Sequence, residues 1–239
     1  MFCASEVFDR NRCPELQWHR NLSGPEQSVN RSGAPGKLYA MYSFLLYLIA
    51  GWSGCFVMAV ELLGGRLLAP YFGSSIYVWG AIITVFMLAL SLGYLLGGRY
   101  SLRLPSLRRL AVILGAAAVT MLPVLIAAES LLDALSARLP DPRLGSLVSA
   151  LMLFLVPTVI SGMVSPYAVR LLVSDRLRSG DSAGKLYFVS TFGSAAGTLL
   201  TSFYLVLYFE VNQILWMMLT VSLLVSAAAL LFPTRSQES

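Results

Sequence analysis

The sequence predicts an all-α fold: a polytopic bundle of six transmembrane helices with both termini in the cytoplasm. Three observations predict it: long charge-free runs, a strongly apolar composition, and a one-sided distribution of basic residues. Of the 239 residues, 57% are hydrophobic and 12% are charged, and the mean hydropathy is +0.73. Such a chain has too little polar surface for a soluble globular protein.

The charge-free runs are each long enough to cross a bilayer. A helix rises about 1.5 Å per residue, so about 20 residues cross a hydrocarbon core about 30 Å thick. The runs are 19 to 32 residues long and are apolar almost all round, which suits lipid better than water. They occupy residues 38–60, 67–98, 110–128, 144–169, 186–209 and 211–234.

The basic residues set the orientation. With six spans and cytoplasmic ends, 14 of the 17 Lys and Arg residues lie inside, and only Arg66, Arg138 and Arg143 lie outside. This distribution follows the positive-inside rule. The sequence therefore predicts a multi-pass membrane protein with cytoplasmic termini, and the net charge of +5 reflects topology rather than nucleic-acid binding.

Three regions are expected along the chain. Residues 1–40 are polar and aperiodic, which predicts a disordered tail without the apolar segment of a signal peptide. Met41 is a plausible alternative start. Residues 41–233 form the six-span membrane domain, and 234–239 form a short C-terminal tail.

The first three spans are expected at 41–60, 76–97 and 107–128. After the first, Pro70, Gly73 and two serines predict a connector that ends the helix near the outer membrane surface. A short outer connection, partly helical, is expected at 129–143.

The last three spans contain one predicted irregularity. Pro157, Gly162 and Pro166 predict a kink or a broken end in the fourth span. Pro233 ends the sixth. These spans are expected at 146–167, 185–208 and 211–232.

Small residues recur at four-residue spacing in two spans. Ala89, Gly93 and Gly97 do so in the second span, and Gly193 and Gly197 in the fifth. This spacing removes bulk from one helix face and allows close helix contact. Ordinary bundle packing is the favoured interpretation.

Glu61 and Arg66 are the charged residues expected at the outer end of the first span. An intramembrane ion is a candidate site because its burial costs free energy. With the nearby aromatic residues Tyr71, Tyr77 and Trp79, they are the ligand-binding candidates.

A purely structural role is the alternative. Glu61 could be hydrated, or bonded to Arg66, to Tyr71 or to a backbone N–H, and so hold the connector. On an ideal helix Glu61 and Arg66 point about 140° apart, so they pair directly only if Gly64 and Gly65 unwind the helix.

Basic residues cluster at the expected cytoplasmic ends of the spans. They are interpreted as topology anchors that also attract the anionic lipid bilayer, by roughly 1 kcal/mol each. They are Arg99, Arg103, Arg108, Arg109, Arg170 and Lys185.

No catalytic, cofactor or metal motif is recognised. The only histidine, His19, lies in the tail, so no Ser-His pair forms among the spans around Ser194. Cys3, Cys13 and Cys55 have neither metal-ligand spacing nor an oxidising compartment, so neither a metal site nor a structural disulfide is expected.

Two segments carry a family resemblance. The run ELLGGRLLAPYFGSSIYVWG within residues 47–99, and the later GKLYFVSTFGSAAGT at 184–198, resemble the membrane portion of bacterial fused membrane/spermidine-synthase-like proteins. That portion is similar to the major facilitator superfamily. Residues 93–99 with Arg103 resemble the superfamily's loop between spans 2 and 3, but residues 93–109 lack its usual acidic residue.

The resemblance implies a location in the bacterial cytoplasmic (inner) membrane and two alternative functions. In fused relatives an aminopropyltransferase-like domain follows the last span, whereas this sequence ends at Ser239. It implies a membrane subunit that acts with a separate soluble spermidine-synthase-like protein and is not itself an enzyme. The alternative is a transporter or permease for a polyamine or another cationic metabolite, formed by a six-span unit that pairs with a second copy as a homodimer.

Overall fold

The computed structural model describes residues 36–102, 105–172 and 179–231, and the side chains from Met41 onward except Ser179. Residues 1–35 of the predicted N-terminal tail, which include Cys3, Cys13 and His19, lie outside the described residues. The predicted C-terminal tail at 234–239 and Arg103 also lie outside them. From residue 40 on, the chain forms one unit of packed helices, and the described residues contain no strand. Six helical stretches are long and apolar enough to cross a membrane, which confirms the predicted all-α bundle of six membrane-spanning helices.

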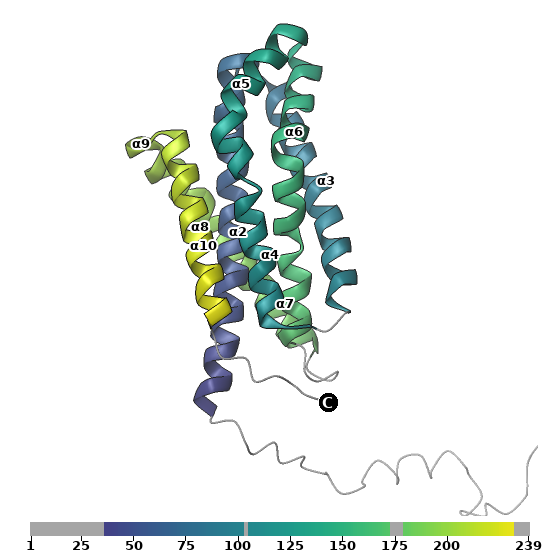
Figure 1. Cartoon of the computed structure of the whole chain (residues 1–239), viewed down its shortest axis with the longest axis vertical. Helices are drawn as coiled ribbons and strands as arrows, with labels where there is room; N and C mark the ends of the chain where they lie inside the picture. Colours follow the sequence, from purple (N-terminus) through teal and green to yellow (C-terminus); the bar gives the residue numbers. More distant parts are fainter. Residues whose placement is uncertain (1–35, 103–104, 173–178, 232–239) are drawn as a thin grey trace, which may run out of the picture. The chain divides into compact units, whose positions relative to one another are not determined.

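Each stretch consists of one helix or of two or three helices end to end (Figure 1). The first two are α2 (Gly36–Phe72) and α3 (Ile76–Ser101). The third joins α4 (Leu107–Val119) to α5 (Leu122–Arg138), and the fourth joins α6 (Pro142–Gly162) to α7 (Val164–Leu172). The fifth joins α8 (Ser179–Leu200), a π-helix η3 (Thr201–Leu205) and α9 (Val206–Tyr208), and the sixth is α10 (Val211–Leu231).

The first span is longer than predicted. The helix already includes residues 36–40, and it continues through Pro70 to Phe72, so the expected break at Pro70 was wrong. Leu68 and Phe72 flank the proline and are almost fully buried, which favours keeping this turn helical. The helix ends at Phe72, and Gly73 follows it with a φ of 81°, a backbone conformation that glycine adopts readily.

The third span has an interruption that the sequence did not predict. Thr120 and Met121 separate α4 from α5, and the Thr120 hydroxyl donates 2.9 Å bonds to the carbonyls of Ala116 and Ala117. Pro123 then lies in the first turn of α5, where its missing N–H is tolerated. The helix continues to Arg138, so most of the expected outer connection at 129–143 is helical.

In the fourth and fifth spans the irregularities lie at single points. Pro157 stays inside α6, and the helix is interrupted only at Met163, directly after Gly162. In the fifth span the π-helix begins at Thr201, whose buried hydroxyl has no hydrogen-bond partner among the described residues. π-Helical segments occur often at functional sites.

Two apolar clusters form the interior of the bundle. One joins α2, α3, α5, α6, η3 and α10 and contains Phe86 and Phe154, whose ring centres are 5.6 Å apart. The other lies toward the opposite end of the bundle and contains Leu46, Leu110 and Tyr167. Both clusters include α2, so this helix is in contact with the core along much of its length.

The predicted small residues lie at close helix contacts. Ala89 is fully buried. A Cβ placed on Gly93 would lie against the Val159 carbonyl oxygen and, at 2.9 Å, against the Gly162 Cα. A Cβ on Gly97 would lie 2.7 Å from the Cα of Met163, which follows Gly162 in the fourth span. These contacts bring α3 against the α6–α7 junction, backbone to backbone.

A second close contact joins α2 to α8. A Cβ on Gly193 would overlap the backbone of Gly51, and one on Gly197 would lie 2.7 Å from the Cα of Cys55. Because both residue numbers rise by four between the two contacts, α2 and α8 run parallel. The same register extends one turn further and brings Thr201 level with Ala59.

Polar bonds between helices supplement this packing. The Trp52 Nε1–H donates to the Ser222 hydroxyl at 2.9 Å, and the buried Ser226 hydroxyl donates to the Ala111 carbonyl at 2.7 Å. These two bonds connect α10 to α2 and to α4. In an apolar interior each such bond contributes about 0.6–1.7 kcal/mol.

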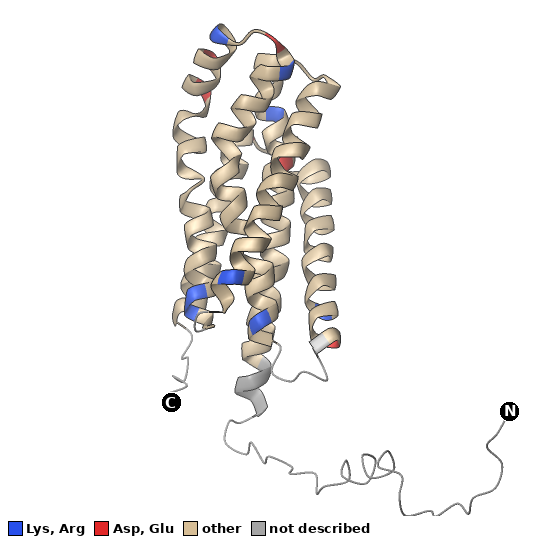
Figure 2. Ribbon diagram, turned by 90° about the vertical axis from the view of Figure 1, so that its right-hand side faces the viewer, with Lys and Arg blue, Asp and Glu red and all other residues tan. Residues whose placement is uncertain are grey.

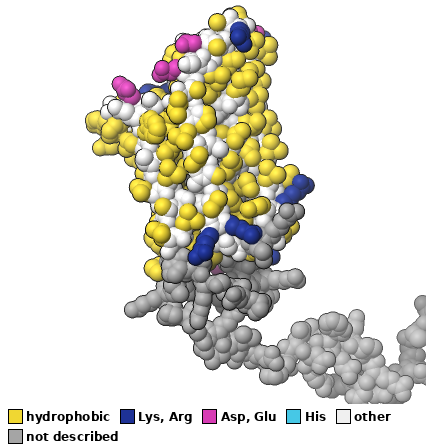
Figure 3. Space-filling model, viewed as in Figure 1, with side chains coloured by type: hydrophobic (Ala, Val, Ile, Leu, Met, Phe, Trp, Pro, Cys, Tyr) yellow, Lys and Arg dark blue, Asp and Glu magenta, His cyan; other side chains and the backbone are white. Residues whose placement is uncertain are grey.

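The outer surface of the bundle is apolar. In Figure 3 hydrophobic side chains cover most of the visible face, and charged side chains gather toward its two ends. Leu88, Leu151 and Leu224 are among the exposed large residues. This surface is that of a multi-pass membrane protein, in which lipid covers the helices.

Candidate functional site

Glu61 lies inside α2, three turns before the end of the helix. Its depth follows from one helix contact and from one distance along α3. A Cβ on Gly65 would lie 2.6 Å from the Trp79 ring, so Trp79 marks the level of Gly65. Trp79 and Arg99 are separated by about 30 Å along α3, the thickness of a hydrocarbon core. A bilayer bounded by these two residues places Glu61 about 6 Å inside its Trp79 boundary.

The Glu61 carboxylate is half-buried and has no charged partner among the described residues. The ion pair found in that part of the chain is Lys185–Asp181, at 2.7 Å. Arg66 is exposed. Because α2 stays helical through Gly64 and Gly65, Arg66 lies on a different face of the helix from Glu61. A purely structural role would use a bond from the Glu61 carboxylate to Arg66, to Tyr71 or to a backbone N–H. No such bond is among the hydrogen bonds of the described residues.

The π-helix lies at the same depth as Glu61. In the register of α2 and α8, Thr201 is level with Ala59, and Glu61 lies about 3 Å further along the axis. The unpartnered Thr201 hydroxyl and the unpaired carboxylate therefore occupy one layer of the bundle. Nothing in the sequence pattern signalled the π-helix or its place beside this layer.

Two of the three aromatic candidates, Tyr77 and Trp79, contact residues other than Glu61 and Arg66. The Tyr77 hydroxyl accepts a 3.0 Å bond from the Arg143 guanidinium, which also lies 4.6 Å from the centre of the Tyr77 ring. Tyr71 lies within electrostatic range of Asp133 and Glu129 of α5. Trp79 packs on Gly65. The structure thus brings Tyr71, Tyr77 and Trp79 to the Glu61 end of the bundle, where Tyr77 contacts Arg143 and Trp79 contacts Gly65.

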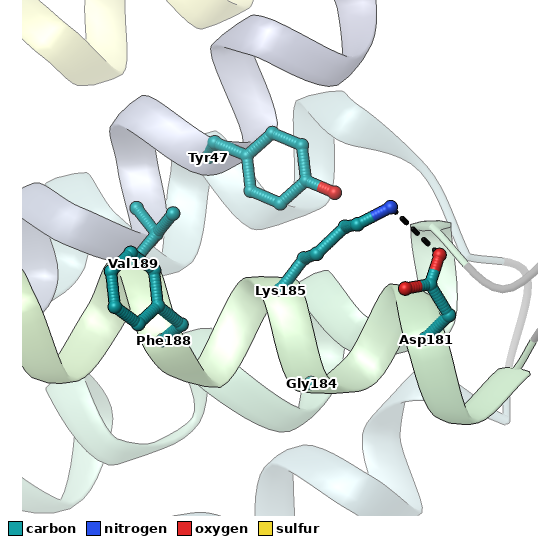
Figure 4. Close-up of a pocket in the computed structure, with 6 residues that line it drawn as sticks. All are labelled: Tyr47, Asp181, Gly184, Lys185, Phe188 and Val189. Atoms are coloured by element: carbon teal, nitrogen blue, oxygen red, sulfur yellow. Dashed lines mark hydrogen bonds and ion pairs between the residues drawn. The ribbon is translucent and has the colours of Figure 1, made fainter.

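A groove between α2 and α8 was missed by sequence reasoning. It has a volume of about 530 Å³ and is lined by Tyr47, Asp181, Gly184, Lys185, Phe188 and Val189. Figure 4 shows the Tyr47 hydroxyl pointing toward the Lys185 ammonium, which is paired with Asp181. The i, i+4 spacing of Asp181 and Lys185 was the available signal. The pair is exposed, so it adds little stability.

The predicted basic residues lie at one end of the bundle. Arg99 lies in the last turn of α3, and Arg108 and Arg109 lie in the first turn of α4. Arg170 lies in the last turn of α7, and Lys185 lies in the second turn of α8. In Figure 2 the blue Lys and Arg segments of the ribbon lie at both ends of the bundle, and most red Asp and Glu segments lie toward the end away from the start of α4. The described part of the chain thus has the charge asymmetry used to predict its orientation.

The described residues contain no group of three or more His, Cys, Asp or Glu side chains that could hold a metal ion. Comparisons with protein-family models, with curated proteins and with solved structures found no match.

Proposed function

We propose that this chain is a membrane transport protein, a permease of the bacterial inner membrane for a small cationic metabolite such as a polyamine, in which Glu61 holds the amine. The observation that carries the proposal is the half-buried, unpaired carboxylate within a membrane span. A carboxylate in this position is costly unless a cation, a proton or water accompanies it.

The surrounding backbone supports a transport role. The π-helix at Thr201–Leu205 lies at the depth of Glu61, and the third and fourth spans are interrupted at Thr120 and Met163. Discontinuous helices are common where transporters form substrate sites and change conformation.

A second copy of the chain fits this proposal as a partner. The span Gly180–Tyr208 has the lowest mean hydropathy of the six and is also the least buried, at 17%. A helix with so much surface exposed to lipid is expected to have a high mean hydropathy, not the lowest of the six. A homodimer that covers α8 would give the twelve-helix arrangement of many transporters.

The direct test is uptake of labelled spermidine into proteoliposomes by the wild type and by Glu61→Gln. We expect wild-type uptake and loss of most of it in the variant. Equal uptake by the two proteins would contradict the role of Glu61.

The basic end favours a second candidate, a membrane subunit that acts with a soluble aminopropyltransferase-like protein. Arg99 and Arg170 are exposed there and could attract an acidic surface of that enzyme. Co-purification from gently solubilised membranes should yield a protein identifiable as such an enzyme by mass spectrometry, and the double variant Arg99→Gln/Arg170→Gln should release it. Recovery of the chain without this enzyme would contradict the second candidate.

A further inference from the structure

A second groove lies at the basic end of the bundle, between α3, α4 and the junction of α6 with α7. Its volume is about 270 Å³. Arginines line one part of it and apolar side chains line the rest. The lining residues include Tyr100, Arg108, Arg109, Val112, Ala116 and Met163.

The groove changes from charged to apolar along the axis of α4. Arg108 and Arg109 lie in the first turn of this helix, where the third membrane span begins. Val112 and Ala116 follow Arg108 on the same face, at i+4 and i+8, and therefore lie about 6 and 12 Å deeper. Val112 is 57% exposed, so the apolar part is open to the hydrocarbon beside it.

The charged part is held in place by the start of α4. The Ser106 hydroxyl accepts a bond from the Arg109 backbone N–H at 3.3 Å. The Ser106 backbone N–H donates to the hydroxyl of Tyr167, a fully buried residue, at 3.2 Å. Arg108 and Arg109 lie in the first turn of α4, where the positive end of the helix dipole also favours an anion.

We infer that this groove binds one anionic phospholipid, with the headgroup phosphate on Arg108 and Arg109 and an acyl chain along Val112, Ala116 and Met163. Guanidinium groups bind phosphate oxygens with charge-assisted hydrogen bonds, and basic pockets between spans on the cytoplasmic side suit such headgroups. The apolar walls distinguish a lipid from a free phosphate, because a free phosphate leaves them without a partner. The inference does not depend on Glu61.

The test is native mass spectrometry of the purified, delipidated full chain titrated with phosphatidylglycerol or phosphatidylcholine. We expect the wild type to retain one phosphatidylglycerol and no phosphatidylcholine. Arg108→Gln/Arg109→Gln should need about tenfold more phosphatidylglycerol for the same occupancy, as loss of roughly 1.4 kcal/mol predicts. Ala116→Phe keeps both charges but fills the apolar part, and it should weaken retention as well.

Two controls separate a built site from general charge attraction and from misfolding. Arg99→Gln/Arg170→Gln removes the same charge at the same end outside the groove and should retain the lipid as the wild type does. Arg108→Lys/Arg109→Lys keeps the charge and should retain most binding. Equal loss in the Arg99/Arg170 variant, equal retention of phosphatidylcholine, unchanged retention by Ala116→Phe, or displacement of the lipid by millimolar inorganic phosphate would overturn the assignment.

Discussion

Replacing Gly93 with leucine should cause a large loss of stability. The added side chain would begin at a Cβ already in contact with the Val159 carbonyl oxygen and the Gly162 Cα. Both obstacles are backbone atoms, so they cannot move aside by changing rotamer. Overpacking costs about 1–3 kcal/mol in ordinary cores, and we expect the upper end of this range here. The measurement is the thermal midpoint of the purified protein in detergent.

Gly98→Leu is the matched control for this prediction. Gly98 lies in the same helix, five residues further on, and a Cβ on it meets nothing within 4 Å. We expect its thermal midpoint to equal that of the wild type or to exceed it, because glycine disfavours the helix interior. Equal loss in Gly93→Leu and Gly98→Leu would show that the contact between α3 and α6 is not as close as described.

Replacing Glu61 with glutamine should reduce spermidine uptake by about tenfold or more, an effect of roughly 1.4 kcal/mol or above. Glutamine keeps the shape and hydrogen-bonding capacity of the side chain but removes the charge. An ammonium group in an apolar layer needs a counter-charge, since its own desolvation is costly. The measurement is the initial rate of uptake into proteoliposomes that contain equal amounts of correctly folded protein.

Glu129→Gln provides the matching control for uptake. Glu129 is an exposed carboxylate of α5 at the same end of the bundle, and its neutralisation should leave the rate within about twofold of the wild type because solvent screens exposed charges. Glu61→Asp keeps the charge with a shorter reach and should retain part of the activity. A common loss in Glu61→Gln and Glu129→Gln would point to surface charge instead of a site.

The six spans were predictable because lipid imposes a length and excludes charge, and both constraints are visible in sequence. The ends of the helices were not. Pro70 was expected to end the first span, but the burial of Leu68 and Phe72 favours another turn. The interruption lies at Thr120, whose hydroxyl bonds to two backbone carbonyls of the preceding turn. A threonine in the sequence of a membrane helix does not by itself show that the helix is interrupted there.

The candidate site was predictable only as a list of unusual residues. A carboxylate beside a long apolar segment is unusual and can be seen in the sequence, so Glu61 was identified. Its surroundings were not, because they depend on contacts between distant segments. Tyr77 bonds Arg143 from 66 residues away, and Thr201 reaches the depth of Glu61 only through the register of α2 with α8. The Gly193 and Gly197 spacing indicated a close contact but not which helix provides it.

The measurement that tests the central claim most directly is labelling of Glu61 with dicyclohexylcarbodiimide, a reagent that modifies carboxyl groups in apolar surroundings. Peptide mass spectrometry follows the rate at Glu61 and at Glu129 in the reconstituted wild type. The proposed amine site predicts that Glu61 is modified and that spermidine at ten times its dissociation constant slows this reaction about tenfold, with no change at Glu129. A rate at Glu61 that spermidine leaves unchanged would contradict the claim.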